Sequence, residues 1–171
     1  MTGDAVWYEA AFVVGVTNAL NVVADGLAGA LEPLDERDAA SDAQAVLDDI
    51  RAFYGGEVPC PLRVVARDPG YLGDLWGAVR RAFDDGRLPR RLKEALAFAV
   101  SLTTRSAFGT PFHLQEMRRL GVSEQGVMEV VGVAQMFSSY TKIADTLQLE
   151  SDMGGIAPVD RTGVPDVLDA P

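Results

Sequence analysis

Apolar residues recur at helical spacing along almost the whole chain, and this periodicity is the feature that most limits the possible folds. Spacings of three and four residues place apolar side chains on one face of a helix, whereas a half-buried strand alternates with a period of two. No run in the sequence alternates for long enough to indicate a strand. The sequence therefore predicts an all-α fold, with about six to seven helices.

Proline, glycine and capping residues predict where these helices begin and end. Asp68 is expected to cap one helix with Pro69 at its first position, and Thr110 to cap another with Pro111 first and His113 third. Ser123 is expected to cap the last helix. The expected helices cover residues 4–31, 41–53, a short segment through 65, 69 to about 86, 89–103, 111–121 and 124–149.

The chain is expected to form one helical domain, residues 1–150, because its length suits a single hydrophobic core. Residues 151–171 mix Gly, Pro and Asp, which indicates an acidic tail that is flexible or contacts a partner.

The first expected helix is apolar on nearly every side. Asn18, Asn21 and Asp25 interrupt its apolar run, which favours a buried helix over a membrane span. One small domain rarely covers such a helix on all sides by itself. We therefore expect a homo-oligomer in which a second copy covers part of it.

The formal charge of −10 argues against a nucleic-acid partner and against an anionic membrane surface, because both require clustered Lys and Arg. A local basic stretch runs from Arg80 to Lys93. This stretch is either a solvated helix end or a patch that attracts an organic acid.

Cysteine usage and the N-terminal residues bear on the compartment. The only cysteine, Cys60, cannot form a disulfide within the chain, which fits a reducing compartment. Asp4 and Glu9 stand where a secretory signal would carry positive charge. The sequence thus predicts a cytoplasmic protein, with Cys60 as a buried structural residue or, as the weaker alternative, a catalytic thiol.

Glu94 begins a helix that has no charge from Ala95 to Thr104, and His113, the only histidine, follows it. A carboxylate is costly to bury unless another group bonds it. A Glu–His pair would serve acid–base catalysis, with the carboxylate fixing the imidazole tautomer. The alternatives are an ion pair of Glu94 with a neighbouring basic residue and a histidine with a purely structural place; the basic neighbours are Arg90, Arg91 and Lys93.

Glu94, Ser106, Gly109 and His113 match the spacing E-x11-C-x2-C-x3-H, with Ser106 and Gly109 at the two cysteine positions. This framework resembles the signature of the alkylhydroperoxidase D-like and carboxymuconolactone decarboxylase superfamily. The similarity covers roughly residues 50–149 and includes the segments 68–76, 86–94, 120–124 and 137–145. The resemblance implies the helical bundle of that superfamily and a trimer or trimer-based hexamer.

The peroxide chemistry of the superfamily needs an attacking thiolate and a second, resolving thiol. Ser106 and Gly109 supply neither, so the sequence argues against a thiol peroxidase of the usual kind. Carboxymuconolactone decarboxylases work without a cysteine pair. The resemblance to them implies a cofactor-free decarboxylase, isomerase or lyase that acts on a small organic acid or cyclic carbonyl compound, with His113 moving the proton and Glu94 orienting it.

Four further side chains are candidates for hydrogen bonding to the substrate: Ser106, Thr110, Ser138 and Tyr140. Aromatic residues are candidates for the pocket walls, namely Phe108, Phe112, Phe137 and Tyr140. One histidine without a ligating cysteine pair does not indicate a metal site. Two other functions stay open: a non-catalytic small-molecule-binding or assembly protein, and a peroxidase-type activity by an atypical route.

Overall fold

The computed structural model describes residues 3–149, and within them the chain is all-helical with no strand, as the sequence predicts. Residues 151–171, expected to form the acidic tail, lie outside the described part. Seven α-helices and a short 3-10 helix follow one another in the order α1 Gly3–Leu27, the 3-10 helix Glu36–Asp38, α2 Ser41–Tyr54, α3 Cys60–Val65, α4 Pro69–Phe83, α5 Arg90–Thr104, α6 Gly109–Arg119 and α7 Glu124–Leu147.

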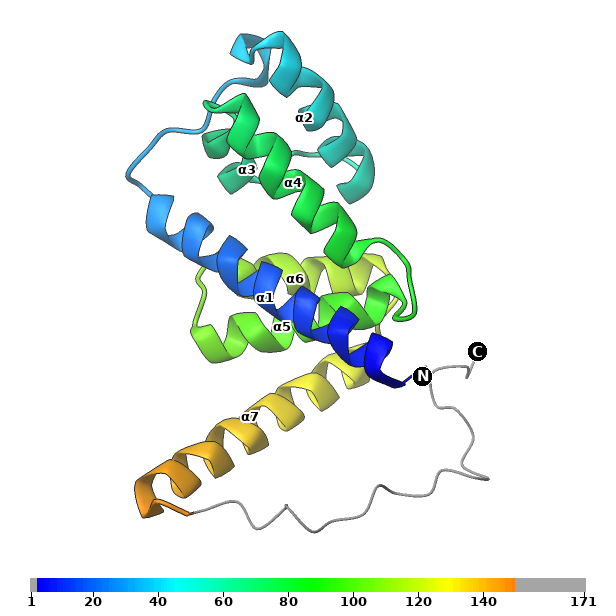
Figure 1. Ribbon diagram of the computed structural model, residues 1–171, viewed down its shortest axis with the longest axis vertical. Coiled ribbons are helices and arrows are strands. Elements are labelled where there is room, and N and C mark those ends of the chain that lie inside the picture. Colours follow the sequence, from blue (N-terminus) through cyan, green and yellow to red (C-terminus); the bar gives the residue numbers. More distant parts are fainter. Residues whose placement is uncertain (1–2, 150–171) are drawn as a thin grey trace.

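Helix α5 is the centre of the arrangement, since it contacts α1, α4, α6 and α7 (Figure 1). Helices α2, α3 and α4 group together at one end, and α1 runs across both groups. The main core lies among α1, α2, α3 and α4 and includes Leu47, Leu72 and Phe83, while Phe98, Met117 and Val127 form a smaller core under α7. The start of α5 and the middle of α6 therefore meet where these groups join.

Two expected helix starts are confirmed. The Asp68 carboxylate accepts a hydrogen bond from the Tyr71 backbone N–H at 3.0 Å, with Pro69 at the first helical position. Ser123 accepts one from the Gly126 N–H at 3.1 Å. Both contacts satisfy backbone donors that the first turn leaves free.

The start of α6 differs from the prediction. The helix begins at Gly109, and Thr110 is not its cap. Ser106 Oγ accepts a hydrogen bond from the Gly109 N–H at 2.8 Å and so takes over the capping role. Pro111 becomes the third helical residue, where its missing N–H costs nothing because the first turn has no internal acceptor for it.

Helix α1 is held to the bundle by polar side chains. Glu9 forms an ion pair with Lys93 Nζ at 2.5 Å, and Asp25 Oδ1 accepts a hydrogen bond from the Phe108 N–H at 3.1 Å. The opposite face is open within one copy, with Trp7 74% and Tyr8 78% exposed. Residues 3–149 therefore do not bury this helix fully. Among the described residues, α1 is also the one helix long and apolar enough to cross a membrane.

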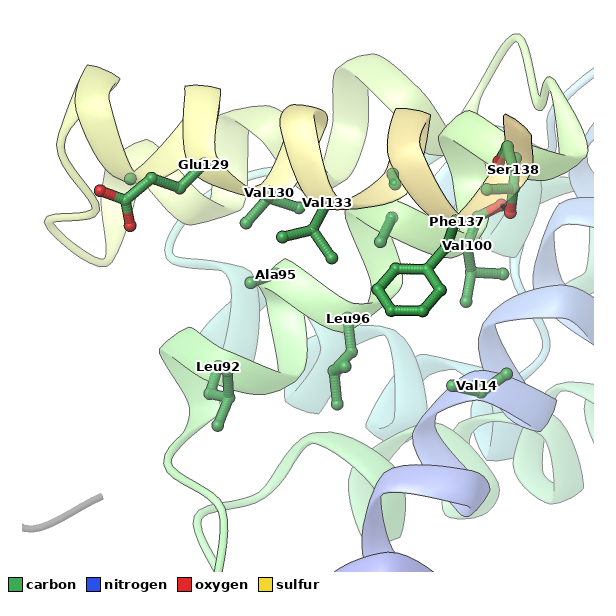
Figure 2. A pocket seen from close by; sticks show the side chains of 14 residues that line it. Val14, Leu92, Ala95, Leu96, Val100, Glu129, Val130, Val133, Phe137 and Ser138 are labelled. Atoms are coloured by element: carbon green, nitrogen blue, oxygen red, sulfur yellow. Dashed lines mark hydrogen bonds between the residues drawn. The ribbon is translucent and has the colours of Figure 1, made fainter. Parts of the chain in front are cut away.

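Helix α7 extends away from the bundle, and Val127 is its only buried residue. An apolar groove of about 450 Å³ separates it from α5 and α1, with Phe137 and Val133 on one side and Leu96 and Val14 on the other (Figure 2). Ser138 lies at one end of this groove, so it belongs to a surface distinct from that of His113.

Candidate active site

Glu94 and His113 are in direct contact, as their spacing predicts. His113 Nδ1 lies 2.8 Å from Glu94 Oε2, between the first turns of α5 and the middle of α6. Both residues are buried, Glu94 with 1% and His113 with 3% of its surface exposed. The pair is thus shielded from bulk water on most sides, which strengthens its electrostatic coupling.

The contact fixes how His113 presents its ring. A carboxylate can only accept hydrogen bonds, so the proton of a neutral His113 lies on Nδ1 and Nε2 keeps a free lone pair. Among residues 3–149 no side chain or backbone group bonds Nε2, and the residue lines a small cavity. The geometry therefore gives a base whose reactive nitrogen is the one not held by Glu94.

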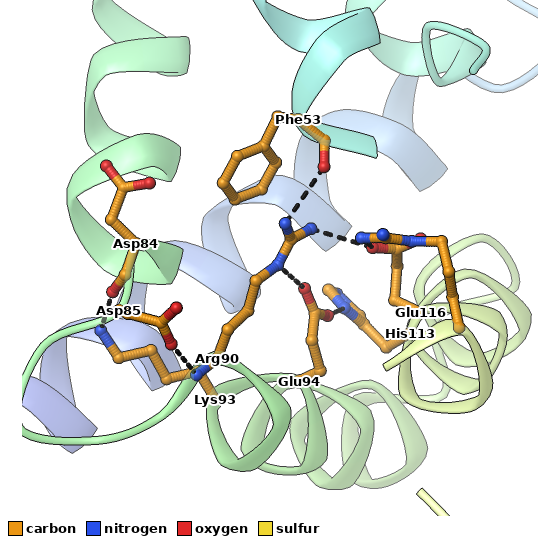
Figure 3. A network of polar contacts seen from close by, with 9 residues as sticks. Phe53, Asp84, Asp85, Arg90, Lys93, Glu94, His113 and Glu116 are labelled. Atoms are coloured by element: carbon orange, nitrogen blue, oxygen red, sulfur yellow. Dashed lines mark hydrogen bonds and ion pairs between the residues drawn. The ribbon is translucent and has the colours of Figure 1, made fainter. Parts of the chain in front are cut away.

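The second oxygen of Glu94 faces a guanidinium. Arg90 Nε lies 3.6 Å from Glu94 Oε1, so the carboxylate contacts the imidazole with one oxygen and the guanidinium with the other (Figure 3). Arg91 is exposed, and Lys93 turns away to bond Glu9 and the Asp84 carbonyl. Of the three basic residues considered from the sequence, Arg90 is thus the one that pairs with Glu94, and it does so without displacing His113.

The cavity beside His113 is small and mostly apolar. Its free volume is about 20 Å³, roughly enough for one water molecule. Asn21 and Tyr54 are the other polar side chains in its lining, which contains no Lys or Arg. The apolar part of the lining consists of Leu20, Val23, Ala24, Pro59, Pro61, Leu62, Leu75, Val79, Phe108 and Phe112.

Aromatic rings fix the orientation of the imidazole. Phe83 stacks on His113 with ring centres 5.9 Å apart and 10° between the planes, and Phe112 meets the ring edge-on at 5.2 Å. Tyr54 contacts Phe112 edge-on at 5.2 Å. A ligand larger than water would have to displace some of the lining side chains, because the cavity leaves only about 20 Å³ free.

Burial, and secondarily the negative charge of Glu94, raise the pKa of Tyr54 far above its usual value of 10. The phenol therefore keeps its proton over the whole neutral range. No group among residues 3–149 forms a hydrogen bond with its hydroxyl, so Tyr54 is an available donor in the cavity lining that it shares with His113.

The four residues expected to bind substrate do not gather at this cavity. Ser106 is buried, and its hydroxyl is used in capping α6. Thr110 lies in the first turn of α6 but outside the cavity lining. Ser138 and Tyr140 are exposed on α7, away from His113. Their role in substrate binding stays a prediction. Of the expected aromatic walls, Phe108 and Phe112 line the cavity and Phe137 lines the groove under α7.

Gly109 stands where the signature places its second cysteine, and it has no room for a side chain. A Cβ atom at this position would overlap Asn21 Oδ1 and Ser101 Oγ. Asn21 is itself held in place, since its Nδ2 donates to Ser101 Oγ at 3.1 Å and to Thr104 Oγ1 at 3.3 Å. Helix α1 thus fills the space that a thiol would need.

Neither Cys60 nor a metal-binding cluster of side chains adds further chemistry to the site. Cys60 is exposed at the start of α3, which corrects the expectation of a buried cysteine. Within the described residues, no three His, Cys, Asp or Glu side chains come close enough to hold a metal ion.

Sequence reasoning missed Asn21 and Tyr54 as members of the cavity. A signal was present for Asn21, because an amide in an otherwise apolar helix needs a polar partner when it is buried. Tyr54 gave no such signal, since it lies at the end of α2 and reaches His113 only through the tertiary fold.

Comparison with known proteins places these features among related folds. The profile of the carboxymuconolactone decarboxylase family matches residues 71–149. A stretch of 104 residues is 28% identical to an alkyl hydroperoxide reductase of Mycobacterium tuberculosis, covering 61% of this chain and 30% of that protein. The chain therefore spans about a third of the length of this relative. The crystal structure of the alkylhydroperoxidase AhpD core from Rhodospirillum rubrum superposes with a TM-score of 0.65 at 25% identity, covering 77% of this chain and 94% of that one.

Proposed function

We propose that the chain, which is similar to members of the alkylhydroperoxidase D-like and carboxymuconolactone decarboxylase superfamily, is a cofactor-free acid–base enzyme with His113 as its base. The observation that supports this most is the 2.8 Å contact from Glu94 to Nδ1 of His113, a residue that lines a cavity and whose Nε2 the contact leaves free. In the proposed reaction Nε2 removes a proton from the carbon next to a carbonyl group. Returning that proton to another atom completes an isomerisation and restores neutral His113.

The substrate class follows from the cavity lining. The lining contains no cation, so a substrate carboxylate would lose its hydration without gaining a charged partner. We therefore favour an uncharged cyclic carbonyl compound over an organic acid. The enolate oxygen that forms when the proton leaves would accept a hydrogen bond from the Tyr54 hydroxyl, which stays protonated at neutral pH.

The proposal excludes the cysteine-based peroxidase cycle, although relatives are named as an alkyl hydroperoxide reductase and an alkylhydroperoxidase. That cycle needs two thiols near each other. The chain has only Cys60, and Asn21 fills the space beside Gly109. A peroxidase of another kind would have to use His113 without a thiol.

Hydrogen–deuterium exchange tests the proposal before any natural substrate is known. Uncharged cyclic ketones and lactones would be incubated with the protein in D₂O, and ¹H NMR would follow the protons next to the carbonyl. We expect enzyme-dependent exchange that His113→Ala abolishes and Tyr54→Phe slows by about 100-fold. Gln135→Ala, at an exposed polar position on α7 outside the cavity lining, is the control and should exchange at the normal rate.

A binding or assembly role is the competing function. If wild-type protein binds such compounds with no exchange, or if exchange survives in His113→Ala, the acid–base proposal is wrong. Binding without exchange would favour the non-catalytic function on the same scaffold.

We also propose that the protein is a cytoplasmic homo-oligomer, a trimer or trimer-based hexamer as the superfamily resemblance implies. Five exposed apolar residues on α7 follow one another at intervals of three and four, which is the spacing of a helix–helix seam. They are Val133, Met136, Tyr140, Ile143 and Leu147, each at least 52% exposed. A seam of this kind on an isolated copy would leave a large apolar patch in water.

A further inference from the structure

Arg90 holds Glu94 from the side opposite His113 and is itself held by several groups. Its Nη2 lies 2.9 Å from Glu116 Oε2, and its Nη1 donates to the Phe53 carbonyl at 3.1 Å. The guanidinium carbon lies 3.6 Å from the centre of the Phe53 ring. Only 14% of the side chain is exposed. Arg90 therefore occupies one defined place between two carboxylates, as Figure 3 shows.

Glu116 is a second buried carboxylate, one helical turn after His113 on α6. It accepts hydrogen bonds from Arg119 Nε at 2.9 Å and Arg119 Nη2 at 2.7 Å, in addition to the one from Arg90. Its exposed fraction is 4%. Three charge-assisted hydrogen bonds offset the cost of burying this carboxylate.

The charges along this row alternate in sign. Arg119, Glu116, Arg90 and Glu94 follow one another and sum to zero, with His113 at the end. The other helices around the imidazole contribute only uncharged side chains: Phe83 from α4, Asn21 from α1 and the protonated Tyr54 from α2. A proton on His113 would therefore add one net charge to a row that is neutral overall and buried except at Arg119.

We propose that Arg90 and Glu116 are positioning residues that control the proton affinity of His113 through Glu94. Neither residue lines the cavity, so neither would touch the substrate. Arg90 holds Glu94 turned so that Oε2 faces the imidazole, and Glu116 balances the charge of Arg90. This inference rests on the proposed function, because proton affinity matters only if His113 acts as a base.

Loss of Arg90 and loss of the charge of Glu116 should shift the titration midpoint of His113 in opposite directions. Without Arg90, the carboxylates of Glu94 and Glu116 would face each other with one fewer cation. A proton on His113 would then be favoured, because it replaces the lost positive charge. Without the charge of Glu116, the positive charge of Arg90 would be only partly balanced. This excess of positive charge would disfavour a proton on His113. An uncompensated charge within a few ångströms shifts such a titration by about one pH unit or more.

The single histidine makes the test direct. The ring ¹H and ¹³C NMR signals of His113 would be followed against pH in the wild type, Arg90→Gln, Glu116→Gln and the control Arg118→Gln. Arg118 is also on α6, but it pairs with exposed Glu124. We expect the titration midpoint to rise by about one pH unit in Arg90→Gln and to fall by a similar amount in Glu116→Gln. Arg118→Gln should leave it unchanged.

Midpoints that shift in the same direction, or that stay within about 0.2 pH units of the wild type in both folded variants, would overturn the inference. If Arg90→Gln does not fold, the direction of the midpoint shift in Glu116→Gln decides. Arg90→Lys, which keeps the positive charge, should have a midpoint near that of the wild type. The result is separate from the exchange assay: opposite shifts without any substrate exchange would keep this inference and reject the enzymatic function.

Discussion

The carboxamide of Asn21 on α1 occupies the space into which a side chain at Gly109 on α6 would extend. Gly109 is buried, and Asn21 cannot move freely because it is bonded to Ser101 and Thr104. The glycine at a cysteine position of the signature is therefore coupled to the sequence of the first helix. Restoring a thiol here would require a change on α1 as well.

Gly109→Ala should destabilise the protein by about 1–3 kcal/mol, because the new methyl group overlaps Asn21 and Ser101. Gly77→Ala, on the exposed side of α4 with no atom near the new methyl group, is the control and should add about 0.5–1 kcal/mol of stability. Urea unfolding measures both. Adding Asn21→Ala to Gly109→Ala should recover part of the loss, and simple additivity of the two changes would contradict the overlap.

The ion pair between Glu9 and Lys93 makes stability depend on pH. Burial acts to raise the pKa of Glu9, but hydrogen bonds from Lys93 and the Arg87 N–H outweigh it, so the pKa lies below the ordinary value of 4.5. A lowered pKa in the folded state stabilises the protein above about pH 4.5, and the effect disappears as the pH falls through the folded-state value. Glu9→Gln should therefore cost about 2 kcal/mol at pH 7.

The loss in Glu9→Gln should shrink when unfolding is measured at progressively lower pH. Glu57→Gln, at an exposed position, should change stability by less than about 0.5 kcal/mol throughout. A cost for Glu9→Gln that is the same at pH 3 and pH 7 would show that the charge of Glu9 is not responsible.

Light scattering at low micromolar concentration should give a mass that is a multiple of 18.3 kDa, three- or sixfold under our proposal. Tyr140→Glu places a charge in the apolar seam of α7 and should reduce the assembled fraction strongly. Gln135→Glu, an exposed polar position on the same helix, should have little effect. A wild-type monomer would reject the assembly proposal and leave the apolar faces of α1 and α7 without an explanation.

Peroxide turnover with a dithiol reductant should be absent. Cys60 is exposed on α3 and has no second cysteine in the chain with which to close a disulfide. If turnover occurs and Cys60→Ser abolishes it, the thiol of Cys60 is active and its exclusion from the site was wrong.

Much of the fold could be predicted from the sequence because its signals are local. Asp68 and Ser123 cap helices where short-range chemistry says they should, and the E-x11…H spacing was sufficient to bring Glu94 to His113. The start of α6 was misjudged by two residues, since Ser106 caps it from outside the helix and Thr110 does not.

The rest of the site depends on tertiary placement, which local patterns do not contain. Tyr54 enters the cavity from α2, and Glu116 matters because Arg90 reaches it across the α5–α6 contact. Ser138 and Tyr140 are exposed and outside the cavity lining, since they belong to α7, which extends away from the bundle in a direction that helical periodicity cannot indicate.

The tautomer of His113 tests the central claim most directly. With the lone histidine labelled by ¹⁵N, the two ring nitrogens give distinct NMR shifts, and neutral His113 should carry its proton on Nδ1 with Nε2 unprotonated. Glu94→Gln should disturb this preference, since the amide can also donate to the ring. A wild-type imidazole protonated on Nε2, or one that exchanges between both tautomers, would contradict the assignment of His113 as a base oriented by Glu94.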